Sequence, residues 1–90
     1  MPTLALTRCR VDDFDSWRSK FDAFVSTQAA LLSYQVWQGT DDPNRVVLLE
    51  TWESREALDS LMSDPRLEEL MAADGVDVSS VTTDVVKEIT

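Results

Sequence analysis

Histidine is absent from this chain, and cysteine and glycine are nearly so. The 90 residues include no histidine, one cysteine (Cys9) and two glycines (Gly39 and Gly75). The lack of histidine removes the commonest general base and the commonest metal and haem ligand of proteins. A lone cysteine forms no disulfide within the chain, and without histidine no ligand set remains for a structural zinc site. Two isolated glycines make no phosphate-binding loop, which argues against a nucleotide or flavin site of that kind.

Positive charge is also scarce. The chain has 17 acidic and 8 basic residues and a net charge of −9. Nucleic acids and anionic membranes would repel it, so we expect neither as a partner. No apolar run approaches the roughly 20 residues of a membrane span. The first residues resemble a strand and not a signal peptide. Together with the single cysteine, these features predict a cytoplasmic protein.

Enough apolar residues are present to build one folded domain over residues 1–90. Hydrophobic residues make up 43% of the sequence, which favours folding over disorder. A domain of this length is near the lower limit for a single core. Its stability must therefore come from close packing or from a partner subunit.

Hydrophobic periodicity predicts two strand-helix-strand units. Apolar residues alternate in the strand segments and recur at spacings of three and four in the helical ones. Aspartates precede the first helix, Ser54 caps the second, and Asp64-Pro65 interrupts the second and restarts it, with Asp64 as the cap. The expected elements are a strand at Thr3–Val11, a helix at roughly 13–28, strands at Leu32–Gly39 and Arg45–Trp52, a helix from Ser54 ended by Gly75, a loop at Asp74–Ser80 and a strand at Val81–Ile89.

This βαββαβ order predicts a ferredoxin-like α+β fold. Two helices would cover one face of a four-stranded antiparallel sheet. The other face would then be bare, and its occupants would include aliphatic side chains, Trp or Tyr, and Cys9 or the first-strand arginines. A monomer rarely exposes so large an apolar patch, so we expect two copies to pack their sheets together as a homodimer.

Several segments resemble the antibiotic-biosynthesis-monooxygenase-like family. They are Asp12-Asp13-Phe14-Asp15-Ser16-Trp17 with Phe21, Asp41-Asp42-Pro43-Asn44-Arg45-Val46-Val47-Leu48-Leu49-Glu50-Thr51-Trp52-Glu53-Ser54, and Ser63-Asp64-Pro65-Arg66-Leu67. The resemblance covers nearly the whole chain and implies the dimeric α+β barrel fold. Because the matching features are structural, they do not transfer a reaction.

Members of this family include cofactor-free oxygenases that convert phenolic or anthrone-type rings to quinones, haem-degrading enzymes, isomerases and cyclases. Haem-degrading relatives hold iron through a histidine, and several cyclase and isomerase relatives also rely on histidine. This chain has none. The resemblance therefore favours a cofactor-independent monooxygenase of secondary metabolism, such as antibiotic biosynthesis. It would act on an apolar aromatic or polyketide-like molecule, which supplies its own reducing power once it is deprotonated.

Three aromatic residues are candidates for the site. Trp37 and Trp52 could form a flat pocket for a planar ligand, and Tyr34 could bond a ring oxygen as a catalytic group. The alternative is packing, because aromatic side chains dominate protein cores and interfaces. Trp17, on the apolar stripe of the first helix, is assigned to the core.

Two arginines and one carboxylate complete the candidate set. Arg8 could stabilise a developing oxyanion and Arg10 could bind substrate, or both could pair with Glu50 or Asp84 across strands. Glu50 lies in an apolar strand, where a raised pKa would suit a general base. Its alternatives are a salt bridge to an arginine or simple exposure. Cys9 is expected to be a buried, unreactive thiol.

Two further functions remain open from the sequence. The chain could be a non-catalytic homodimer that binds a hydrophobic small molecule or assists a pathway, or a cyclase or isomerase of the same fold. A structural protein without a ligand is also compatible with the sequence. Neither a cofactor nor a metal is expected for the monooxygenase.

Overall fold

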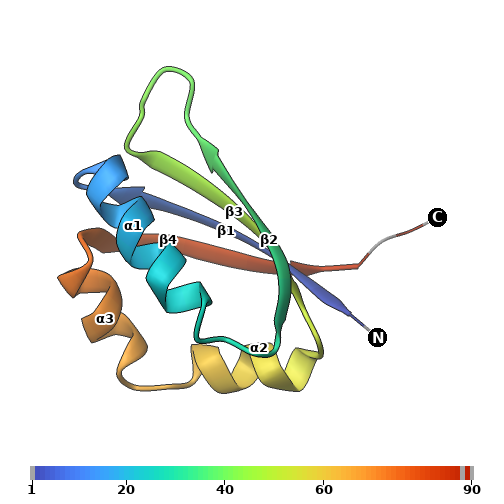
Figure 1. Ribbon diagram of the computed structural model, residues 1–90. Helices are drawn as coiled ribbons and strands as arrows, with labels where there is room; N and C mark the ends of the chain where they lie inside the picture. Colours follow the sequence, from blue (N-terminus) through green and yellow to red (C-terminus); the bar gives the residue numbers. More distant parts are fainter. Residues whose placement is uncertain (1, 88, 90) are drawn as a thin grey trace.

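The structure, a computed structural model, describes residues 2–87 and 89. Its elements follow the expected order along the chain (Figure 1). They are β1 (Thr3–Val11), α1 (Phe14–Val25), β2 (Leu31–Gln38), β3 (Arg45–Trp52), α2 (Arg55–Met62), α3 (Leu67–Ala73) and β4 (Val76–Val86).

The strands form a four-stranded antiparallel sheet in the order β2-β3-β1-β4. The helices gather on one side of it, and the loop between β2 and β3 projects beyond the sheet (Figure 1). The ferredoxin-like α+β prediction is therefore confirmed. Glu50 of β3 lies between Ala5 of β1 and Tyr34 of β2, so these three side chains share the helix-facing side.

Two groups of buried residues form the core between helices and sheet. One joins Trp17 of α1 to Cys9, Val46 and neighbouring apolar residues of the sheet. Trp17 stacks on Phe21 with their ring centroids 5.0 Å apart, as the core assignment predicted for this helix. The other group joins Trp52 to two small or aliphatic neighbours, Ala5 and Leu58. Burial of these aromatics supplies much of the stabilisation available to so short a chain.

Side-chain caps explain where the helices begin. The Asp13 carboxylate accepts the Ser16 N–H at 3.0 Å at the start of α1, and the Ser54 hydroxyl caps α2 in the same way. The first helix ends at Val25, earlier than the expected residue 28. The hydroxyl groups of Ser26 and Thr27 donate to carbonyls of the last turn, and such bonds compete with helix continuation.

The expected break of the second helix is confirmed, with a difference in its restart. The helix divides into α2 and α3, and Gly75 ends α3 with a φ of 86°. Asp64 accepts the backbone N–H of Arg66 at 2.9 Å, but α3 begins only at Leu67, and Arg66 precedes it without a side-chain cap bond. Asp64 therefore shapes the turn before α3.

The expected loop at Asp74–Ser80 is wrong, because β4 already begins at Val76. Three polar residues of this segment, Asp77, Ser79 and Ser80, lie where the register between β1 and β4 shifts. Ser80 accepts the backbone N–H of Arg10 at 2.9 Å, and Asp77 accepts bonds from Ser79. These side chains bridge a bulge, so a segment with loop-like composition continues the sheet. The strand ends at Val86, short of the expected Ile89.

Within residues 2–87 and 89, none of the helices has the length and apolar character needed to cross a bilayer.

Candidate functional site

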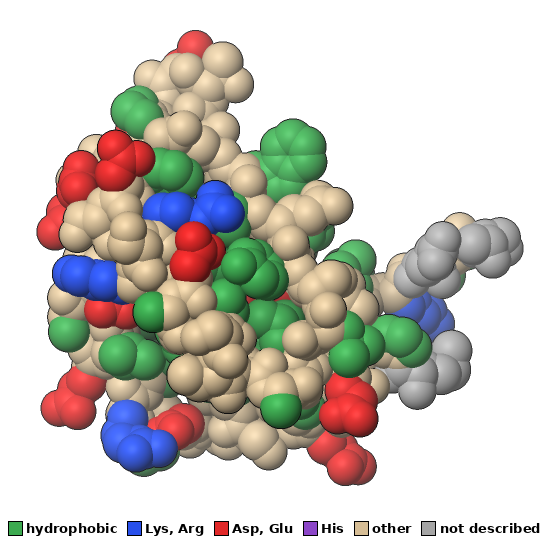
Figure 2. Space-filling model, in the orientation of Figure 1, with side chains coloured by type: hydrophobic (Ala, Val, Ile, Leu, Met, Phe, Trp, Pro, Cys, Tyr) green, Lys and Arg blue, Asp and Glu red, His purple; other side chains and the backbone are tan. Residues whose placement is uncertain are grey.

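A cavity of about 590 Å³ lies between the helices and the sheet. Apolar side chains supply most of the cavity wall. Figure 2 shows hydrophobic side chains at the surface in the middle of the molecule. Its lining from the sheet is Thr7, Cys9, Leu48, Glu50, Val76, Val81 and Thr83, and its principal lining from the helices is Trp17, Phe21, Phe24, Leu58, Leu61, Met62, Leu67, Leu70 and Met71. Its volume is within the range of small-molecule sites.

Glu50 is the ionisable group that the sheet presents to this cavity. Strand β3 alternates its side chains, so Val46, Leu48, Glu50 and Trp52 all face the helices. The Glu50 side chain is only partly exposed, because it is packed in the sheet and opens onto the cavity. Burial raises the pKa of this carboxyl above its ordinary value of 4.5.

Trp52 lies beside Glu50 on the same face of β3. Its side chain is 2% exposed and packs with Ala5 and Leu58. The indole N–H opposes the effect of burial on the Glu50 pKa. Its geometry nevertheless falls short of a hydrogen bond, since Nε1 is buried without a partner among the described residues. The Trp52 N–H therefore lies in the core beside the Glu50 carboxyl, and Trp52 is not among the residues that line the cavity.

Cys9 lines the cavity but lacks a neighbour that would activate it. Its side chain is 8% exposed, and burial raises the pKa of its thiol to about 11. A thiol in such surroundings stays protonated near neutral pH. The structure therefore agrees with the expectation of an unreactive buried thiol.

Tyr34 faces the helices without lining the cavity. Its ring meets the edge of Phe21 at a centroid distance of 5.6 Å, and its hydroxyl donates to Asp22 of α1 at 3.2 Å. Phe21 does line the cavity. Tyr34 therefore supports one wall from behind.

Arg8, Arg10 and Trp37 lie on the opposite face of the sheet. Arg8 forms an ion pair with Asp84 at 3.5 Å, one of the cross-strand alternatives expected for it, and Arg10 pairs with Asp42 at 2.6 Å. The Trp37 side chain is 59% exposed. The six candidate residues are thus separated by the sheet, and of the six, Glu50 is the one that lines the cavity.

Sequence reasoning missed the helical side of the site. Phe21, Phe24 and Leu61 follow ordinary amphipathic spacing, which does not distinguish a cavity wall from a solid core. Glu68 and Asp74 also border the cavity, and nothing in their spacing distinguishes them from ordinary solvated helix residues. The sequence feature that could have indicated the cavity is the helix break at Asp64-Pro65, because this break separates α3 from α2.

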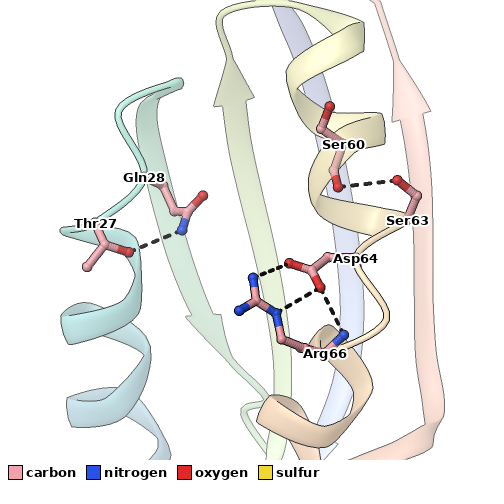
Figure 3. Close-up of polar contacts among 6 residues, drawn as sticks. All are labelled: Thr27, Gln28, Ser60, Ser63, Asp64 and Arg66. Atoms are coloured by element: carbon pink, nitrogen blue, oxygen red, sulfur yellow. Dashed lines mark hydrogen bonds and ion pairs between the residues drawn. The ribbon is translucent and has the colours of Figure 1, made fainter.

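A second groove adjoins the cavity where α1 faces the α2–α3 junction. Phe24, Leu61 and Leu67 border both spaces. At the junction, Arg66 donates to the Asp64 carboxylate at 3.1 Å, and Thr27 and Gln28 at the end of α1 face this pair across the groove (Figure 3). The groove therefore marks a route between solvent and the cavity.

In the described part of the chain, no cluster of three or more Cys, Asp or Glu residues is arranged to hold a metal ion.

Similar proteins share the complete architecture at low sequence identity. SnoaB, a cofactor-independent oxygenase from Streptomyces nogalater, is 15% identical, with a TM-score of 0.75 over 99% of this chain and 94% of that one. Rv0793 from Mycobacterium tuberculosis is 21% identical, with a TM-score of 0.68 over 100% of this chain and 97% of that one. A conserved protein from Methanosarcina mazei Go1 is 14% identical, with a TM-score of 0.72 over 99% and 94% of the two chains.

No curated protein sequence matches this chain. The family model described as "Antibiotic biosynthesis monooxygenase" matches residues 9–73. That segment extends from near the end of β1 to the end of α3 and includes both Glu50 and Trp52. The chain therefore belongs to the antibiotic biosynthesis monooxygenase family.

Proposed function

We propose that this protein is a cofactor-independent monooxygenase that oxidises an electron-rich aromatic or polyketide-like molecule inside the cavity. The observation that carries the proposal is the position of the buried Glu50 carboxyl on the wall of a 590 Å³ cavity that is otherwise mainly apolar. Family membership supports the same chemistry, because SnoaB is a cofactor-independent oxygenase.

Glu50 acts as the general base. Its raised pKa brings it closer to that of a weakly acidic carbon or phenol, which favours proton transfer. Trp52 lies beside Glu50 on β3 and does not line the cavity, so it acts as a packing support for that carboxyl. Tyr34 acts as a positioning residue, because it holds Phe21 and Asp22 and does not line the cavity.

The reaction balances with molecular oxygen as the sole co-reactant. Glu50 takes a proton from a ring CH₂ group activated by neighbouring phenol and carbonyl groups. The resulting anion gives one electron to O₂, and the two radicals combine into a peroxide anion. Glu50 returns its proton to the peroxide, which loses water to leave a ring carbonyl. The sum is CH₂ + O₂ → C=O + H₂O, and no flavin is required because the substrate anion supplies the electrons.

The second face of the sheet is assigned to a homodimer contact. Arg8, Arg10 and Trp37 lie there, on the same side as the half-buried Leu6 and Leu49. Two copies that pack these faces together would remove the apolar groups from water. In this assignment residues 1–90 form one cytoplasmic domain. Sedimentation equilibrium should then give twice the chain mass of 10.1 kDa, and a Leu49→Lys variant should sediment as a monomer.

Oxygen uptake tests the catalytic proposal. Purified protein is mixed with anthrone in an oxygen electrode, and quinone formation is followed by absorbance against the uncatalysed rate. Glu50→Gln should lower the enzymatic rate by about 10²–10⁴-fold, which is the usual contribution of a general base. Glu53→Gln removes an equal charge at an exposed position and serves as the matched control.

Each result separates the candidate functions. Uptake that Glu50→Gln abolishes and Glu53→Gln leaves unchanged supports the monooxygenase. Anthrone binding without any oxygen uptake would instead assign the cavity to a non-catalytic binding protein. If Glu50→Gln leaves the rate of oxygen uptake unchanged, Glu50 is not the general base.

A further inference from the structure

We infer that the cavity selects ligands by charge: it accepts neutral or positively charged aromatic molecules and rejects those that carry a carboxylate, sulfate or phosphate. This inference rests on the proposed function, in that it takes the cavity to be the substrate site. It adds the substrate's charge class, which the family does not supply.

The charged groups that border the cavity all have the same sign. Carboxylates come from Glu50 on β3, Asp64 at the α2–α3 junction, Glu68 on α3 and Asp74 at the end of α3. No lysine or arginine is among the cavity-lining residues that the structure describes. The rest of the wall is mainly aromatic and aliphatic, so few polar groups screen these charges.

The nearest basic groups lie in the outer groove. Lys20 and Arg66 border that groove and not the cavity. Arg66 is engaged by Asp64 through two hydrogen bonds, at 3.1 and 3.3 Å, and compensates that carboxylate (Figure 3). Glu50, Glu68 and Asp74 form no ion pair within the described part of the chain. The uncompensated charge on the cavity wall itself is therefore negative.

A bound anion would be unfavourable at both ends of this site. At its inner end it would approach Glu50, and near the outer groove it would pass Asp74 and Glu68. Like charges repel one another, and no arginine or lysine along the cavity wall offers the fork or ammonium that usually binds a carboxylate or phosphate. The net charge of −9 adds a long-range repulsion during approach.

The substrate should therefore enter uncharged and ionise only when Glu50 removes its proton. That transfer leaves Glu50 neutral, so the substrate anion and the Glu50 carboxylate never coexist. A precursor with a free carboxylate must lose or mask it first, so a decarboxylation, an esterification or an amidation has to precede this step.

Three naphthalene compounds of similar size test the inference. They are 2-naphthylmethanol, 2-naphthylmethylamine and 2-naphthoate, which are neutral, cationic and anionic near neutral pH. Their dissociation constants are measured by isothermal titration calorimetry on the intact protein, on Glu50→Gln and on the exposed control Glu53→Gln. We expect the alcohol and the amine to bind and 2-naphthoate to bind at least about tenfold more weakly than the alcohol. Glu50→Gln should narrow that difference, and Glu53→Gln should leave it unchanged.

The outcomes distinguish a failure of this inference from a failure of the proposed function. If 2-naphthoate binds as tightly as the alcohol or more tightly, charge selection is refuted and the cavity stands as an aromatic site. If none of the three compounds binds, the cavity is not an aromatic binding site, and both proposals fall.

Discussion

The buried carboxyl of Glu50 should make the protein less stable as pH rises above 4.5. Its side chain lies between the strands that carry Ala5 and Tyr34, faces an apolar cavity and has no basic partner among the described residues. Burial raises its pKa above 4.5 in the folded state, while the unfolded chain keeps the ordinary value. Between these two pKa values the folded state binds more protons, so the free energy of unfolding falls as pH rises. The stabilising contribution is complete below about pH 4.5 and is lost as pH passes the folded-state pKa.

Replacing Glu50 with glutamine should remove this pH dependence. The amide keeps the shape of the side chain and needs no proton to be neutral. At about pH 8 the variant should be more stable by on the order of 1 kcal/mol, because an unpaired buried carboxylate costs more than an unpaired neutral amide. For a domain of this size, that gain corresponds to a rise in Tm of roughly 4–8 °C per kcal/mol.

The measurement is urea unfolding, followed by tryptophan fluorescence, at about pH 5 and about pH 8. The absence of histidine helps, because few other groups titrate between these values. Glu53→Gln is the control, since it relieves the same general negative charge at an exposed position. The reasoning is refuted if Glu50→Gln gains no more stability at the higher pH than Glu53→Gln does. It is also refuted if the wild-type protein loses no stability between the two pH values.

Three further predictions concern packing, backbone conformation and thiol reactivity. Trp52→Ala should lower the free energy of unfolding by about 3–5 kcal/mol, because the Trp52 side chain is 2% exposed. A loss below about 1 kcal/mol in urea unfolding would contradict this prediction. Gly75→Ala should cost more than about 1 kcal/mol, because φ is 86° and the added Cβ would collide with the Asp12 carboxylate. Measured in an Asp12→Ala background, the same substitution should cost less; an equal cost would show that the collision contributes nothing. Cys9 should react with iodoacetamide far more slowly in the native protein than in urea, because its thiol is buried with a pKa of about 11. Equal reaction rates in the two conditions would show that the thiol is not protected by burial.

Much of the fold follows from local patterns that survive in the structure. The bounds of β1 and β3 agree with the prediction, because alternation and the flanking polar residues define those strands without help from elsewhere. The caps at Asp13 and Ser54 form as expected, since each requires only neighbouring backbone N–H groups. The start of β4 was missed because Asp77 and Ser80 owe their extended conformation to contacts with Arg10 on a distant strand.

The candidate site also combines features that the sequence predicts with features that only the folded structure decides. Alternation placed Arg8 and Arg10 together on one side of β1, and placed Glu50 and Trp52 together on one side of β3. It does not say which side of each strand the helices cover. The pairing of Ala5 with Glu50 decides that the carboxylate faces the helices while the arginines face away.

The sequence by itself determined the element order, the helix caps, the acidic charge and the lack of histidine, because each depends on residue identity or on neighbours along the chain. The tertiary structure alone decided that the helices leave a cavity against the sheet, that Glu50 opens onto it, and that its charged border is wholly acidic. These features arise where distant segments pack together. A helical stripe that lines a cavity has the same spacing as one that fills a core, so only packing distinguishes the two.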